Sequence, residues 1–237
     1  MSSHESRSGD AAPATPIPRL PAGSRLYRYE QQLDTWWQDQ MLSTLIAALN
    51  MHDGGTADHS ARVASLVVDL AKEAGYAADS PELEEVRRGA LLHDIGKLGV
   101  DTAILQNPGS LSDDEWQAME THPALGYLIL KEIPPLLGTV EMVYASHERW
   151  DGGGYPRGLE GDQIPEGACL LSLADGWDSM ISDRPYRKEL SFDAALQKVH
   201  DNAGTHFDPM VVAAFDRGSR SEAVVGKRAS LRPRPEC

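Results

Sequence analysis

The chain has 237 residues, of which 41% are hydrophobic and 24% are charged, and this ordinary globular composition excludes a disordered or collagen-like protein. Its 22 Lys and Arg residues against 36 Asp and Glu residues give a formal net charge of −14, which argues against a protein that binds duplex DNA or anionic membranes. The two cysteines, Cys169 and Cys237, cannot form a disulfide framework, and the polar start lacks the apolar core of a signal peptide, so we expect a cytoplasmic protein. The longest apolar stretch, 41–51, is about half of the ~20 residues that a membrane-spanning helix needs, so we expect no membrane span.

The first predicted element is a disordered tail over 1–24, where Ser, Pro, Ala and Gly leave few apolar residues to offset the entropy of ordering. From Leu26 to Leu49, apolar residues recur every three or four positions without Pro or Gly. This period predicts a long amphipathic helix in the segment 25–51. Its apolar face either packs against the rest of the protein or is partly exposed, in which case 26–49 would form a homodimer.

Further helices follow, and several carry terminal signals. Ser80 is a predicted N-cap, Ser112 and Glu115 have the spacing of a capping box, and Gly75 occupies a C-cap position. No alternating run is long enough to demand a sheet, so the sequence predicts an all-α fold, a helical bundle. The expected helices cover 57–75, 81–93, 112–121, 123–131, 136–148, 166–181, 192–203 and 209–215.

Two segments are predicted to be non-helical. Residues 150–165 contain too many glycines for a helix and are expected to form a loop, and 218–237 mixes prolines with cations and is expected to be a flexible tail. The remaining length suits one folded domain over 52–217.

Four of the eight histidines fall at or near the ends of successive predicted helices: His59, His93, His122 and His147. Helix ends in a bundle can converge, and the carboxylates of Asp94 and Asp175 would then lie beside the imidazoles. Neutral imidazole and carboxylate together suit a divalent transition metal. Taken singly, each histidine is more often a core or surface residue, so the joint pattern carries the hypothesis.

Five sequence motifs, in this order along the chain, resemble those of a known protein family. They are LHDIGKLG at 92–99, THP at 121–123, SHERWDGGGYP at 146–156, LADGWDSMISDRPYR at 173–187 and GTHFDP at 204–209. Together they resemble an HD-GYP domain, the subgroup of the HD metal-dependent phosphohydrolase superfamily that hydrolyses cyclic di-GMP in bacteria. The resemblance implies an HD-type helical bundle with a glycine-rich GYP loop.

The resemblance also implies roles for individual residues. Two divalent transition ions, Fe or Mn first and Zn, Ni or Co as alternatives, would activate a water for attack on the 3′–5′ phosphodiester. Asp94 would bridge the ions, and Lys97 would act with it in catalysis and bind a substrate phosphate. Tyr155, Arg184 and Arg187 would also contact the substrate. The implied metal ligands are His59, His93, Asp94, His122, His147 and Asp175.

Two positions depart from the family pattern. Ser146 replaces the first of two adjacent histidines, and Gly55 replaces a glutamate that supports a third ion in some members, so we expect two ions rather than three. Three readings stay open: a cyclic di-GMP phosphodiesterase, a catalytically weak module that binds cyclic dinucleotides, and a phosphohydrolase for another nucleotide such as cyclic GMP-AMP. The expected partners are a cyclic dinucleotide and a diguanylate cyclase or other signalling protein.

Overall fold

The computed structural model describes residues 25–53, 57–183 and 188–219. The tails predicted for 1–24 and, except for its first two residues, for 218–237 therefore lie outside the described residues. Within the described ranges the chain is helical, with two isolated β-bridges, Asp151 to Glu160 and Ala203 to Phe207, and no strand. The predicted all-α fold is confirmed. None of these helices combines the length and the apolar character that crossing a bilayer requires.

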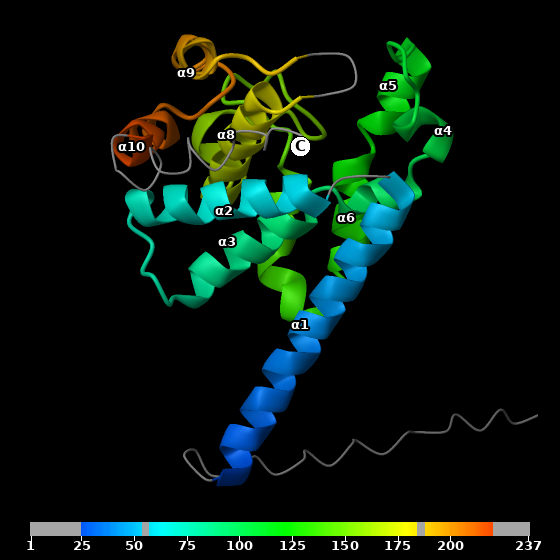
Figure 1. Ribbon diagram of the computed structural model, residues 1–237, viewed down its shortest axis with the longest axis vertical. Helices are drawn as coiled ribbons and strands as arrows, with labels where there is room; N and C mark the ends of the chain where they lie inside the picture. Colours follow the sequence, from blue (N-terminus) through cyan, green and yellow to red (C-terminus); the bar gives the residue numbers. More distant parts are fainter. Residues whose placement is uncertain (1–24, 54–56, 184–187, 220–237) are drawn as a thin grey trace, which may run out of the picture. The chain divides into compact units, whose positions relative to one another are not determined.

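Figure 1 shows the arrangement of the helices, coloured in chain order. The short 3-10 turns are designated η in the text. Helix α2 packs against α3, α8 and α10, and α6 packs against η1 and α7. The elements are α1 Arg25–Asp53, α2 Ala57–Ala74, α3 Pro81–Leu92, η1 Ile95–Gly99, α4 Thr102–Leu105, α5 Asp113–Met119, α6 His122–Leu130, η2 Pro134–Thr139, α7 Val140–Tyr144, η3 Gly161–Gln163, α8 Glu166–Ile181, α9 Phe192–Asp201 and α10 Pro209–Ser219.

The predicted helix ends have the expected local causes. Ser80 accepts the backbone N–H of Leu83 through its side chain at 3.1 Å, which caps α3. The side chains of Ser112 and Glu115 each accept a backbone N–H of the other residue, which forms the predicted capping box of α5. Helix α2 ends one residue before Gly75, whose φ is +109°.

The helix predicted over 136–148 is wrong in its extent. The chain forms the 3-10 turn η2 over Pro134–Thr139 and then a short helix, α7, that ends at Tyr144. Two prolines at the start of η2 restrict the backbone there. After Tyr144 the chain turns, so that Glu148 is buried and accepts two backbone N–H groups of the glycine-rich loop, and this tertiary contact overrides local helix propensity. The prediction also missed α4, which has only four residues.

Two apolar cores lie on either side of the end of α3. The first core is built by α2, α3, α8, α9 and α10, and α8 is apolar around most of its circumference. The second core is built by the last part of α1, η1, α6, η2 and α7, and includes Leu42, Leu49 and Leu130. Ala90 of α3 belongs to the first core and Leu92 to the second. His93 and Asp94 therefore follow directly on a helix that is anchored on both sides.

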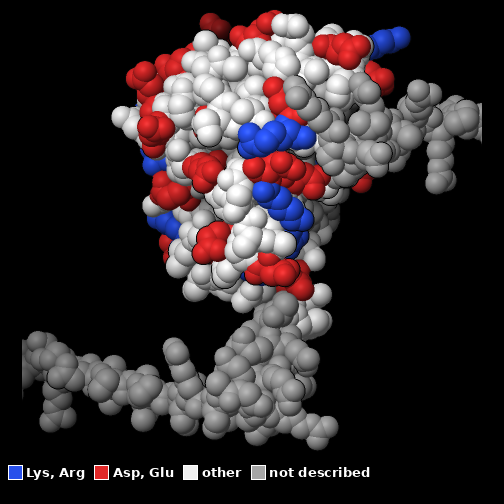
Figure 2. All heavy atoms as spheres, turned by 90° about the vertical axis from the view of Figure 1, so that its left-hand side faces the viewer, with Lys and Arg blue, Asp and Glu red and all other residues white. Residues whose placement is uncertain are grey.

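The predicted long helix is present as α1, and residues 25–40 and 41–219 of the described chain form separate compact units. Residues 41–53 contribute to the second core, as the core-packing reading expects. In the first unit, the side chains of Leu33, Trp36 and Trp37 are exposed. Figure 2 shows one face of the molecule, where acidic side chains are spread widely and basic ones lie among them.

One close backbone contact fixes the position of η1. Gly96 lies so near the first turn of α6 that a Cβ there would strike the carbonyl oxygen of His122 and the backbone nitrogen of Gly126. Only glycine fits at such an approach. The contact sets the spacing between the turn that carries Asp94 and the helix that carries His122.

Candidate metal centre

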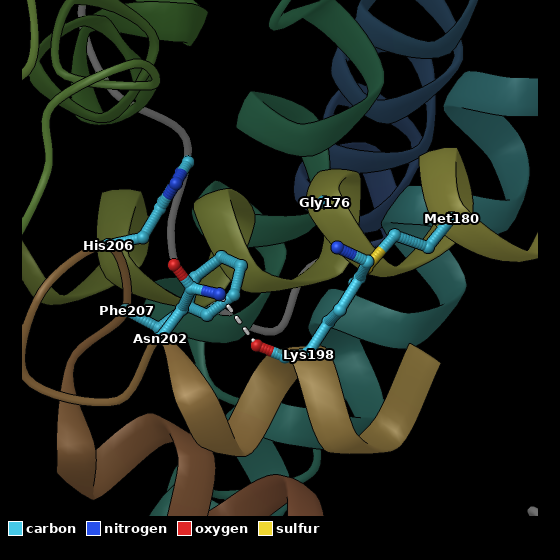
Figure 3. Close-up of a pocket in the computed structure, with 6 residues that line it drawn as sticks. All are labelled: Gly176, Met180, Lys198, Asn202, His206 and Phe207. Atoms are coloured by element: carbon cyan, nitrogen blue, oxygen red, sulfur yellow. Dashed lines mark hydrogen bonds between the residues drawn. The ribbon is translucent and has the colours of Figure 1, made fainter. Parts of the chain in front are cut away.

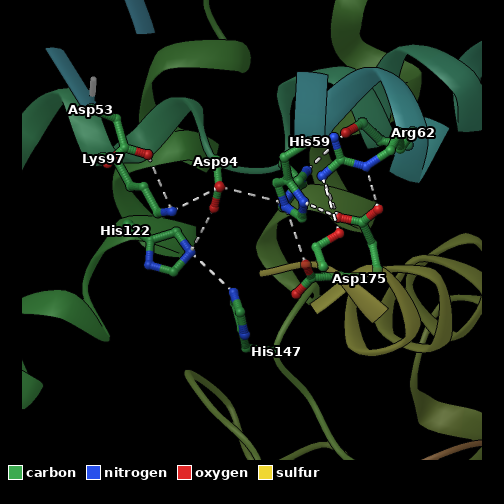
Figure 4. Close-up of polar contacts among 12 residues, drawn as sticks. Asp53, His59, Arg62, Asp94, Lys97, His122, His147 and Asp175 are labelled. Atoms are coloured by element: carbon green, nitrogen blue, oxygen red, sulfur yellow. Dashed lines mark hydrogen bonds and ion pairs between the residues drawn. The ribbon is translucent and has the colours of Figure 1, made fainter. Parts of the chain in front are cut away.

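The six predicted metal ligands form two groups of three (Figure 4). The first triad is His59 of α2, His93 at the end of α3 and Asp175 of α8, and the second triad is Asp94, His122 at the start of α6 and His147, which follows α7. Within each triad the candidate ligand atoms lie within 4.8 Å of one another. Imidazole nitrogens and carboxylate oxygens at this separation fit a divalent transition metal ion.

Asp94 lies between the triads. Its Oδ2 is 3.5 Å from Nε2 of His93 in the first triad, and its Oδ1 is 3.7 Å from Nε2 of His122 in the second. Burial alone would raise the pKa of this carboxyl, but electrostatic interactions with His93, Lys97 and His122 hold it well below its usual range. Asp94 is therefore an ionised carboxylate that presents one oxygen to each triad.

Two of the imidazoles are oriented by the backbone. Nδ1 of His93 lies 2.8 Å from the carbonyl oxygen of Ala90, and Nδ1 of His122 lies 2.8 Å from that of Met119. A carbonyl can only accept, so Nδ1 of each ring carries the proton and Nε2 presents a lone pair to the site. Nε2 of His122 lies 3.1 Å from Nε2 of His147, so these two nitrogens converge on one point.

His59 is held differently, by carboxylates. Its Nε2 lies 3.2 Å from Oδ1 of Asp175, and its Nδ1 lies 2.7 Å from Oδ2 of Asp178. Burial lowers the pKa of His59, but the hydrogen bonds to the two carboxylates outweigh burial and raise it to about 9. The sequence analysis missed Asp178 and its partner Arg62, although each lies three residues after a predicted ligand on the same helix face.

The glycine-rich loop brings Tyr155 onto the second triad. The Tyr155 ring stacks on the His147 imidazole with centroids 5.0 Å apart and planes 5° apart, and its backbone N–H donates to the His147 carbonyl. Gly154 packs against the backbone of residues 147–149 so closely that a Cβ would collide with it. The buried Glu148 accepts the backbone N–H groups of Arg157 and Leu159 at 2.8 and 3.0 Å, which closes the loop. Tyr155 thus has a described contact with a candidate ligand.

Lys97 lies beside the second triad. Its Nζ is 2.8 Å from Oδ2 of Asp94 and 3.5 Å from Oδ2 of Asp53, the last residue of α1. Burial lowers the pKa of Lys97, but the charges of Asp94 and Asp53 raise it above its usual value. Ser146, next to His147, is buried, and its hydroxyl makes no hydrogen bond within the described part of the chain.

Three predicted positions cannot be placed. Arg184 and Arg187, the predicted phosphate contacts, and Gly55 lie outside the described residues.

The GTHFDP motif at 204–209 forms backbone hydrogen bonds with the start of the glycine-rich loop. The carbonyl oxygens of Thr205 and His206 accept the backbone N–H groups of Asp151 and Trp150. Two residues of this motif, His206 and Phe207, also line a cavity of about 270 Å³ between α8 and α9 (Figure 3). None of the predicted site residues lines it; its lining is Gly176, Met180, Lys198, Asn202, His206 and Phe207.

Comparison with known proteins agrees with this fold. A family model described as HD domain matches residues 43–211. This match shows that the chain belongs to the HD domain family. Its ordered HD and GYP motifs fit the HD-GYP branch of that family.

Two curated relatives illustrate the family. The chain is 35% identical over 199 residues to the cyclic di-GMP phosphodiesterase response regulator RpfG of Xanthomonas campestris, an alignment covering 83% of this chain and 52% of the relative. It is 41% identical over 162 residues to the 3′3′-cGAMP-specific phosphodiesterase 3 of Vibrio cholerae, covering 68% of this chain and 35% of the relative. The chain thus spans about half or less of the length of these relatives.

A solved structure shares the fold. Bd1817, an HD-GYP-type protein of Bdellovibrio bacteriovorus, superposes with a TM-score of 0.55 at 23% identity, covering 68% of this chain and 52% of that chain.

Proposed function

We propose that this chain is a metal-dependent phosphodiesterase that hydrolyses the 3′–5′ phosphodiester of cyclic di-GMP. The observation that carries the proposal is Asp94, whose two carboxylate oxygens face a histidine of each triad. A carboxylate so placed suits the bridge of a two-metal centre. The names of several relatives, RpfG among them, support cyclic di-GMP as the substrate.

The donor set fits two divalent transition ions, Fe or Mn first, with Zn, Ni and Co as alternatives. The first triad would hold one ion and the second triad the other, with Asp94 shared. The described side chains suit this role because the Nδ1 atoms of His93 and His122 are already engaged by carbonyls, which leaves each Nε2 for coordination. When bound, such ions supply Lewis acidity that activates water and neutralises phosphate oxygens.

The other proposed site residues act on the substrate. Lys97 carries a positive charge beside Asp94 and is proposed to bind the scissile phosphate and to offset charge that develops on its oxygens. Arg184 and Arg187 are proposed to bind the substrate phosphates, since the arginine fork matches a phosphate in two contacts. Tyr155 forms a wall over His147, where its ring edge would meet the substrate.

The test is turnover by the full chain. Protein stripped with a chelator and reloaded with Fe²⁺ or Mn²⁺ is incubated with cyclic di-GMP, 3′3′-cGAMP and cyclic di-AMP, and products are separated by chromatography. We expect cyclic di-GMP to be linearised by loaded protein and left intact by stripped protein. Loaded protein that cleaves none of the three substrates would contradict an enzymatic function.

A second candidate substrate is 3′3′-cGAMP, which differs from cyclic di-GMP in one purine. The observation that favours it is the relative of 41% identity, which is named as specific for 3′3′-cGAMP. A third reading is a binding module with little catalysis, for which Ser146 is the motive because it leaves a hydroxyl where the family places an imidazole. The ratio of the two turnover rates in the assay above, or binding without turnover, separates these readings.

The domain limits and partners are also proposals. We propose that 52–217 is the catalytic domain and that 26–49 forms a homodimer, because Leu33, Trp36 and Trp37 expose apolar surface there. Light scattering of the wild type and of Trp36→Ser/Trp37→Ser tests this, with a monomer expected only for the variant. A diguanylate cyclase or other signalling protein is the proposed protein partner.

A further inference from the structure

Two side chains outside the six candidate ligands extend the first triad. Helix α2 carries His59 and Arg62, and α8 carries Asp175 and Asp178, so each helix contributes a pair spaced three residues apart. The pairs meet face to face, since α2 packs against α8. His59 contacts both carboxylates, and Arg62 contacts Asp178 (Figure 4).

The contact between His59 and Asp178 fixes the imidazole. Oδ2 of Asp178 lies 2.7 Å from Nδ1 of His59. An ionised carboxylate can only accept, so Nδ1 carries a proton that Asp178 holds in place. In the metal-free protein Nε2 likewise donates to Asp175, and a bound ion would take the place of that Nε2 proton. His93 and His122 receive the same orientation from backbone carbonyls, so His59 is the described ligand histidine whose ring is fixed by a side-chain carboxylate. A charged acceptor makes the ring a stronger donor to a metal than a carbonyl does.

Arg62 in turn holds Asp178. Its Nε lies 2.6 Å from Oδ1 and its Nη2 lies 2.9 Å from Oδ2, a fork that grips both carboxylate oxygens. The Asp178 side chain is only 7% exposed, whereas that of Arg62 is 38% exposed, so the arginine covers the buried carboxylate from the solvent side. The fork removes the rotational freedom that a lone carboxylate would have. The His59 ring is therefore held by Asp178, which is in turn held by Arg62.

We propose that Asp178, held by Arg62, is a positioning residue that fixes the His59 ring and strengthens the first triad's grip on a divalent transition ion. This inference rests on the proposed function, because it assumes that the first triad binds metal. It assigns no role to Asp178 in the second triad, which it does not contact in any described interaction. The expected consequence is thus confined to one of two metal-binding steps.

The test is a Co²⁺ titration of the chelator-stripped full chain, followed by its visible absorption and by competition with a chelator. His59→Ala and His147→Ala identify which binding step belongs to which triad. In Asp178→Asn, which keeps the side-chain size, we expect the first-triad step to weaken by about 10- to 100-fold and its Co²⁺ spectrum to change, with the second step unchanged. Arg62→Gln should cause a smaller loss at the same step, and Arg62→Lys should recover part of it.

The matched control is Asp216→Asn. Asp216 also pairs with a histidine, His200, at 2.9 Å, but on α10 and away from both triads. This variant should bind Co²⁺ as the wild type does. Thermal unfolding of the stripped proteins shows whether Asp178→Asn folds, and Arg62→Gln gives a second measurement if it does not.

The outcomes separate the two proposals. Wild-type affinity at both steps in Asp178→Asn and Arg62→Gln, or equal losses at both steps, would overturn the positioning role while leaving the metal centre in place. A wild-type chain that binds no Co²⁺ would overturn both. Two-step binding with the expected loss but without cyclic dinucleotide turnover would support Asp178 and reject the enzymatic function.

Discussion

Two residues of the first triad lie inside long helices, whereas the residues of the second triad lie at a helix start or in the turns that follow helices. His59 and Asp175 lie inside α2 and α8, and His59 is held by hydrogen bonds to the carboxylates of Asp175 and Asp178. His147 lies in irregular chain after α7, and its ring is covered by Tyr155 rather than gripped by a charge. The two groups offer a metal similar atoms, but His59 of the first triad is held by carboxylates, whereas His147 of the second is held by burial and by its stack on Tyr155.

The difference appears in the basicity of the histidines. Paired carboxylates raise the pKa of His59 to about 9, whereas burial lowers the pKa of His122 to about 4 against the opposing charge of Asp94. Burial also lowers the pKa of His147. Similar ligand sets can therefore differ in how firmly they are oriented and in how they respond to substitution nearby. The following predictions test this contrast, from the largest expected effect to the smallest.

Asp94→Asn should remove the contrast by damaging both triads, because one Asp94 oxygen faces each of them. We expect metal affinity to fall at both steps by at least the ~10- to 100-fold scale of outer-contact changes, and turnover to be lost. Lys97→Ala should keep the metal and lose turnover. Isothermal titration and the nucleotide assay measure the two effects, with the exposed Asp79→Asn as control. Equal metal loss in Asp94→Asn and Lys97→Ala would contradict the separate roles.

Ser146→His should strengthen the second triad alone. The Ser146 hydroxyl is buried and makes no hydrogen bond among the described residues, so an imidazole would add a donor where none is engaged. We expect affinity at the second step to rise by about 10-fold, within the range of nearby ligand changes, and turnover at limiting metal to rise with it. Ser146→Ala is the control. If Ser146→His and Ser146→Ala behave alike, Ser146 does not stand at a ligand position.

Tyr155→Leu should weaken the second triad by a smaller amount. An aromatic pair contributes ~0.5–1.5 kcal/mol beyond its burial, so loss of the stack on His147 should cost about 2- to 10-fold in metal affinity at the second step. Tyr155→Phe keeps the ring and should keep that affinity, while its turnover reports on the hydroxyl. A Co²⁺ titration compares the two variants. Equal loss in both would mean that the hydroxyl, not the stack, supports His147.

The smallest effect concerns pH in the metal-stripped protein. The pKa of His59 is above its ordinary 6.5, so its stabilising contribution is complete below pH 6.5 and is lost as pH rises through about 9. The pKa of His122 is below 6.5, so its contribution is complete above pH 6.5 and is lost as pH falls through about 4. NMR titration should find His59 protonated and His122 neutral at pH 7. Two rings titrating together near pH 6.5 would refute the contrast.

Much of the fold follows from local signals in the sequence. Apolar period and capping residues predict the long helices, and α8 has the predicted limits of 166–181. The turn after Tyr144 was not predictable in this way, because it depends on Glu148 reaching backbone groups nine and eleven residues further along the chain. Local propensity carries no information on such a contact.

In the candidate site, too, some residues could be predicted from the sequence and others depend on tertiary packing. Five of the six ligand candidates lie in the ordered motifs, and His59 was inferred from the helix-end pattern and the family resemblance; the structure brings all six together in two groups of three. Asp178 and Arg62 carry no motif of their own, and only the packing of α2 on α8 shows that their spacing matters. Tyr155 was predicted to meet the substrate, but its stack on His147 depends on the path of a glycine-rich loop that no periodicity describes.

The close backbone contact between Gly96 and α6 couples the turn that follows Asp94 to the helix that begins at His122. Because backbone contacts backbone there, no flexible side chain can adjust to a change in the distance between Asp94 and His122. A designer who wished to retune the distance between the two triads would have to shift a whole helix. Gly96→Ala would force such a shift, because its methyl group would collide with the backbone of α6. The separation of Asp94 and His122 thus depends on the missing side chain of Gly96, and a single substitution at that position would change it.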